Sequence, residues 1–193
     1  MCEVHNVDGG MATGDTVILA DEEVDIERPI AEVRRICSAA NDVVRMVMGG
    51  NFPAALALCK RFVDDPEVLG AAFCCVYNVS SRKPATRQGL YEGGIFTIIT
   101  EAMERFKDDV LLQEMGCRAL GAIAVSDNYK TPVGARGVDL IFDAMVTHAG
   151  AVLVHRAGCR ALSIIIKDHD ENKAKFLAAA NPQGGGIKVS VRR

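Results

Sequence analysis

The chain has 193 residues, of which 49% are hydrophobic and 5% aromatic, and its formal net charge at pH 7 is −3. This length and hydrophobic content suit one domain with a substantial core or an array of small stacked units. No apolar run approaches the roughly 20 residues of a membrane span, and residues 1–20 lack the pattern of a signal peptide, so we expect no membrane contact and a cytoplasmic location, with nuclear or cytoskeletal association as alternatives.

The first 28 residues differ from the rest of the chain in charge. Residues 1–28 contain eight acidic residues and one basic residue, whereas residues 29–193 contain 17 acidic and 21 basic residues. The glycines and scattered charges of the first segment cannot bury enough apolar surface to offset the entropy lost on ordering. We therefore expect a flexible acidic tail at residues 1–28 and a mildly basic helical domain at residues 29–193.

Helical periodicity begins directly after the tail. Apolar residues recur at the spacing of one helix face from Ile30 to Cys37, which predicts a helix over residues 29–48 that caps the domain. A second helix is expected after Gly50. The next helix starts at Asp65-Pro66-Glu67, which combines an N-cap acid, a proline in the first turn and an acid favoured by the helix dipole.

An internal repeat of 42 to 44 residues organises this helical domain. The segment Gly-Cys-Arg-Ala-Leu occurs at residues 116–120 and again at 158–162, and the helix expected after Gly50 recurs after Gly94 and Gly137. The period is longer than tetratricopeptide or ankyrin units and fits armadillo or HEAT units. One unit cannot bury its own apolar face, so the units must stack. The predicted units are residues 41–84, 85–128 and 129–169, with a partial unit at 170–193.

Short motifs mark the turns between these predicted helices. Gly49-Gly50 and Gly93-Gly94-Ile95 precede a second helix, residues 64–68 precede a third helix, and residues 75–80 end one. Through these motifs the chain resembles the armadillo-repeat family. The resemblance implies an all-α fold, a right-handed superhelical α-solenoid of about three armadillo-like repeats plus partial terminal repeats. It also implies that the third helices line a concave groove that binds peptides or partner surfaces.

The groove-lining pattern departs from the best-known members of that family. Their repeated asparagine corresponds here to Asn78, Ala122 and Ile164, and their tryptophan to Cys74, Arg118 and Arg160. A peptide ladder of the nuclear-import type is therefore not expected.

Charged side chains are scarce on the predicted third helices. A helix that is apolar nearly all round is buried on most sides, so its remaining polar stripe must face the open, concave surface. Arginine side chains there suit carboxylates or phosphorylated groups. The alternative is that Glu114 and Arg118, one turn apart, simply pair and solvate the helix. The predicted partner-binding residues are Asn78, Arg82, Glu114, Arg118, Arg156 and Arg160.

The search for catalytic chemistry finds no motif. The four histidines are not spaced as a cluster, and Asp168-His169-Asp170-Glu171 is interpreted as a capped turn rather than a metal site. The glycines at 184–186 lack the spacing of a phosphate loop. The small basic excess and scarce aromatics argue against nucleic acid. We predict no enzymatic activity, no cofactor and no metal, and interpret the seven cysteines as small core residues, with Cys117 and Cys159 buried at equivalent positions.

Together these patterns predict a non-catalytic protein–protein interaction scaffold or adaptor that binds a partner, an acidic peptide or surface, in its concave groove. The alternative is a regulatory repeat fragment of a larger multidomain enzyme or assembly. The partial last unit, in which Gly186-Ile187 starts another helix, predicts an end that is frayed, covered by a partner or used for oligomer formation.

Overall fold

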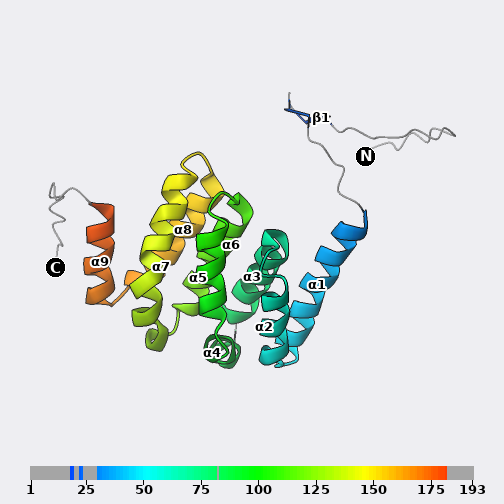
Figure 1. Ribbon diagram of the computed structural model, residues 1–193. Helices are drawn as coiled ribbons and strands as arrows, with labels where there is room; N and C mark the ends of the chain where they lie inside the picture. Colours follow the sequence, from blue (N-terminus) through cyan, green and yellow to red (C-terminus); the bar gives the residue numbers. More distant parts are fainter. Residues whose placement is uncertain (1–17, 20–21, 24–29, 82, 182–193) are drawn as a thin grey trace, which may run out of the picture. The chain divides into compact units, whose positions relative to one another are not determined.

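The computed structural model describes residues 18–19, 22–23, 30–81 and 83–181 (Figure 1). The chain divides into two compact units, residues 1–35 and residues 36–193. In the first unit, β1 (Ile18–Leu19) and β2 (Glu22–Glu23) pair antiparallel, with Ile18 opposite Glu23. The rest of the predicted acidic tail lies outside the described residues.

The described part of the second unit is all-helical, as the sequence predicts. Helix α1 (Ile30–Met48), whose first six residues belong to the first unit, covers the predicted capping helix. It is followed by α2 (Phe52–Arg61), α3 (Pro66–Ser80), α4 (Pro84–Glu92), α5 (Ile95–Arg105), α6 (Val110–Ile123), α7 (Asp127–Thr147), α8 (Val152–Ile166) and α9 (Asp170–Ala180). None of the described helices combines the length and apolar character that a membrane crossing requires.

Local capping chemistry fixes several of the helix starts. The side chain of Asp65 accepts a hydrogen bond from Val68 N at 3.2 Å, and Pro66 occupies the first turn of α3. Asp109 caps α6 in the same way, with its carboxylate 2.8 Å from Leu112 N. Each cap satisfies a backbone donor that the first helical turn leaves without a partner. The predicted start of the helix at residue 65 is confirmed.

One predicted helix boundary, at Gly137, is wrong. Gly50 and Gly94 have φ of 77° and 94°, a left-handed conformation that glycine adopts at little cost, and each turns the chain into a new helix. Helix α7 instead runs unbroken through Gly137, which lies buried in the helix interior. The residue before it is Arg136, a good helix former, whose guanidinium is held by Glu104 of α5 at 2.6 Å. A helix therefore continues where the two earlier repeats turn.

The helices pack in two rows with the core between them. Helix α6 lies between α3 and α8, and α7 contacts α5, α8 and α9 (Figure 1). Fully buried side chains at this interface include Phe73, Leu112, Leu120, Ile141 and Ile165.

The 42-residue sequence shift recurs in this packing. A side chain at Gly116 would overlap Met103, and one at Gly158 would overlap Met145. The second glycine and the second methionine each follow the first by 42 residues. Helices α5 and α6 therefore approach each other in the same way as α7 and α8.

Helix α9 lies at the start of the predicted partial unit, residues 170–193, and is tied to α7 and α8 by buried polar contacts. Asn172, only 2% exposed, donates from Nδ2 to Lys130 O at 2.9 Å and to Ile165 O at 3.0 Å. His169 caps the helix, with its Nδ1 accepting from Asn172 N at 3.2 Å. The predicted capped turn is present, and a histidine rather than an acid supplies the cap. The helix expected around Gly186 lies outside the described residues.

Candidate functional site: the third-helix face

A small hollow opens on the face formed by α3, α6 and α8. Its volume is about 150 Å³, below the roughly 300–1,000 Å³ typical of small-molecule pockets, so it fits one side chain rather than a cofactor. Its lining is mostly small or apolar, with two arginines: Tyr77, Ser81, Cys117, Arg118, Gly121, Ala122, Val125, Ala157, Arg160, Ala161 and Ile164.

Close packing of α6 on α8 produces the small-residue floor of this hollow. A side chain at Gly121 would come within 3.1 Å of the Ala161 side chain, so the two helices touch almost at backbone distance. Cys117 and Ala157 lie one turn earlier on the same helices. The second copy of the Gly-Cys-Arg-Ala-Leu segment, residues 158–162, therefore supplies both Ala161 at this contact and Arg160 in the wall of the hollow.

Arg118 is already neutralised within the protein. Its guanidinium lies 2.5 Å from Glu114 Oε1, and the Glu114 side chain is 5% exposed. The same guanidinium lies 5.8 Å from the centre of the Tyr77 ring on α3, within the range of a cation–π contact. Its Nε is buried and has no hydrogen-bond partner in the described part of the chain. The i, i+4 pair considered as the alternative to a binding role is formed, and Glu114 lies inside the domain rather than on an open surface.

Unlike Arg118, the two arginines on α8, Arg156 and Arg160, are not neutralised by a neighbouring acid among the described residues. Both are exposed, and neither guanidinium has an ion-pair or hydrogen-bond partner among the described residues. By the 42-residue shift Arg160 corresponds to Arg118, whereas Arg156 corresponds to Glu114. Where α6 has the buried Glu114, α8 therefore has a second arginine, Arg156.

The remaining predicted contact residues lie apart from the hollow or outside the described chain. Asn78 is exposed on α3, and its Nδ2 lies 3.6 Å from Cys74 Sγ one turn earlier, so it does not line the hollow. Arg82 lies outside the described residues. Tyr77, which the sequence analysis did not select, faces Arg118 instead.

The prediction that Cys117 and Cys159 are equally buried is wrong. Cys117 is 0% exposed, and burial raises the pKa of its thiol to about 12, whereas Cys159 is exposed. Cys117 lies on the face of α6 that α8 covers. On α8 the equivalent Cys159 stays exposed although α9 contacts that helix, so equivalence in sequence does not give equivalence in burial.

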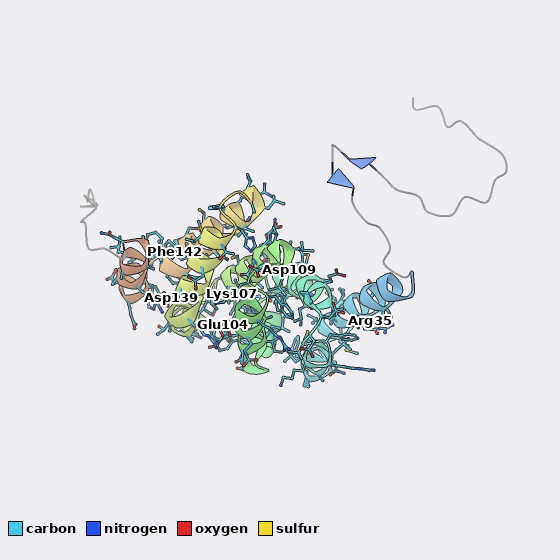
Figure 2. All side chains as sticks on the ribbon, turned by 45° about the horizontal axis from the view of Figure 1, so that its top comes forward. Arg35, Glu104, Lys107, Asp109, Asp139 and Phe142 are labelled. Atoms are coloured by element: carbon cyan, nitrogen blue, oxygen red, sulfur yellow. The ribbon has the colours of Figure 1, made fainter. Side chains whose placement is uncertain are left out.

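Two further clefts lie beside α5, and no motif in the sequence indicated them. One, of about 400 Å³, lies between α5 and α7, where Glu104, Lys107 and Asp139 are labelled in Figure 2. Its charges are largely satisfied, because Glu104 pairs with Arg136 and Asp139 with Lys175 at 2.9 Å. The other, about 370 Å³, is lined by α2, α3 and α5 at positions one repeat earlier.

Comparisons with family models, with curated proteins and with solved structures found no match.

Proposed function

We propose that this chain is an armadillo-like α-solenoid scaffold that binds a protein partner, an acidic peptide or surface, on the face formed by α3, α6 and α8. The repeated helix-to-helix contacts, 42 residues apart, support the solenoid arrangement. The partner-binding role is non-catalytic.

One observation carries this proposal: the hollow on the third-helix face combines a floor of small apolar residues with Arg160, which, like Arg156 one turn earlier on α8, has no ion-pair partner among the described residues. On α6 the equivalent arginine, Arg118, is paired with Glu114, whereas Arg160 on α8 is exposed to solvent and open to a partner. Arginine beside an apolar pocket is instead typical of the residues that contribute most to protein interfaces.

A second candidate is a regulatory unit within a larger assembly, and it is favoured by the surface of α9. Leu177 on that helix is 49% exposed, and Ala174 and Ala178 lie on the same helical face and are also exposed. A cluster of this kind indicates a surface that another segment or chain covers.

The proposal is tested by selecting peptides from a random display library against the purified chain and measuring their affinity for two tryptophan variants. Val125 is 49% exposed at the edge of the hollow, so Val125→Trp should fill the hollow without disturbing the core. Val146, 75% exposed on α7, lines none of the clefts described above, and Val146→Trp is the matched control.

Selected peptides should bind Val125→Trp at least about tenfold more weakly than wild type and bind Val146→Trp unchanged, because hot-spot contacts cluster in such pockets. A selection that yields no binders, or binders that tolerate both variants equally, would contradict the proposal.

A further inference from the structure

We propose that Arg156 and Arg160 on α8 bind the carboxylate of a partner glutamate, while the neighbouring hollow receives an adjacent apolar side chain of the same partner segment. This inference rests on the proposed function, and it names the element by which the third-helix face recognises its partner.

A comparison of α6 with α8 shows which chemical group α8 lacks beside its arginine. On α6, Arg118 is held by a glutamate one turn earlier, and the pair is partly buried. On α8, Arg160 is in the equivalent position, but the residue one turn earlier is Arg156. The chain therefore satisfies this type of arginine with a glutamate carboxylate in one repeat and leaves the carboxylate to be supplied from outside in the next.

The two arginines are arranged to favour an anion. Residues 156 and 160 are i and i+4 on one helix, so their guanidinium groups lie on the same face and repel each other by about 0.2–0.5 kcal/mol. A carboxylate bound between them removes that repulsion and accepts charge-assisted hydrogen bonds, for which the planar guanidinium is well suited. Because both side chains are exposed, the unbound site remains solvated and does not destabilise the fold.

The size and lining of the hollow determine which residue of the partner lies next to its glutamate. Arg160 lines it together with Ala157, Ala161 and Ile164 from the same helix, so the anion site and the apolar site share a wall. A hollow of about 150 Å³ has room for a leucine- or methionine-sized side chain and not for a second charged group that would need its own partners. The segment recognised is therefore a glutamate next to an apolar residue.

Phosphorylated side chains are the competing anion. We assign the carboxylate because the one anion bound to this arginine position within the described residues is the Glu114 carboxylate.

The experiment is an oriented peptide array probed with the purified full chain. Each spot fixes two central residues, Glu-Leu, Gln-Leu, Glu-Ser or phosphoserine-Leu, and leaves the flanking positions degenerate. The array is probed with wild type, with the double variant Arg156→Gln/Arg160→Gln, and with Arg61→Gln. Arg61 is an exposed arginine on α2, so the last variant controls for the loss of a surface charge.

Wild type should prefer Glu-Leu over both Gln-Leu and Glu-Ser. The double variant should bind Glu-Leu at least about tenfold more weakly, since truncating one side of a charge pair at an interface typically costs that much or more. Arg61→Gln should behave as wild type, and both variants should melt within about 2 °C of it, the range expected of exposed substitutions.

Three outcomes overturn the inference. They are equal binding of Glu-Leu and Gln-Leu, a stronger signal for phosphoserine-Leu than for Glu-Leu, or unchanged binding by the double variant. If peptides selected by display still lose affinity for Val125→Trp in any of these cases, the third-helix face remains the binding site and only its recognition element is wrong. If those peptides also ignore Val125→Trp, the proposed function fails as well.

Discussion

Replacement of Gly134 by alanine tests how the last described helix is held. Gly134 is buried in α7, and a Cβ at this position would overlap the side-chain amide of Asn172 on α9. Asn172 cannot move aside without losing its hydrogen bonds to Lys130 O and Ile165 O. The substitution should therefore loosen α9 although it improves the helix propensity of α7.

The expected magnitude follows from two opposing terms. Alanine in a helix interior is favoured over glycine by about 1 kcal/mol. Breaking the two buried hydrogen bonds that Asn172 Nδ2 donates deprives this amide of its acceptors and costs about 1–2 kcal/mol per bond, or about 2–4 kcal/mol in all. The net loss of stability at α9 should be about 1–3 kcal/mol.

Gly137→Ala is the matched control on the same helix. A Cβ there would lie 3.5 Å from Leu120 Cδ1 and from Val133 Cγ1, which is ordinary van der Waals contact. This variant should gain up to about 1 kcal/mol, because it improves helix propensity without a clash.

Native-state hydrogen exchange at residues 170–181, together with chemical denaturation, measures the difference. Protection of α9 should fall in Gly134→Ala and stay the same or rise in Gly137→Ala. If both variants change stability in the same direction and by the same amount, α9 does not pack against α7 as described.

Two further predictions concern single side chains. Cys117 should resist thiol reagents in the native state, since burial raises the pKa of its thiol to about 12, whereas exposed Cys159 should react at the rate of denatured protein. Time-resolved labelling followed by mass spectrometry measures both rates. Equal rates at the two cysteines would contradict the assigned burial. Glu114→Gln should lower unfolding free energy by about 1–3 kcal/mol, as measured by denaturation, because Arg118 loses its counter-charge, and it should raise affinity for acidic peptides.

Features set by local chemistry could be predicted from the sequence. The start of α3 at Asp65-Pro66 was predicted correctly, since capping residues act within one or two turns. The all-helical class followed from the same periodicity. The pairing of Glu114 with Arg118 was foreseen as one of two readings because it is an i, i+4 contact within one helix.

Features set by contacts between distant helices could not be predicted in the same way. Cys117 and Cys159 lie in identical pentapeptides, yet one is buried and one exposed, because burial depends on which helix packs next. Gly137 resembled two glycines that end helices, but the ion pair of its neighbour Arg136 with Glu104, 32 residues away, accompanies a continuous helix. The clefts beside α5 arise from the spacing of whole helices, for which a single sequence carries no signal.

Site-specific photo-crosslinking tests the central claim most directly. A benzophenone amino acid at residue 164, which is half-buried in the hollow, is compared with the same group at residue 97, in the cleft beside α5, in the presence of a peptide selected by display. If α3, α6 and α8 form the partner-binding face, the peptide crosslinks from position 164 and not from position 97. Crosslinking from position 97 alone would place the partner on the opposite row of helices and contradict the proposed function.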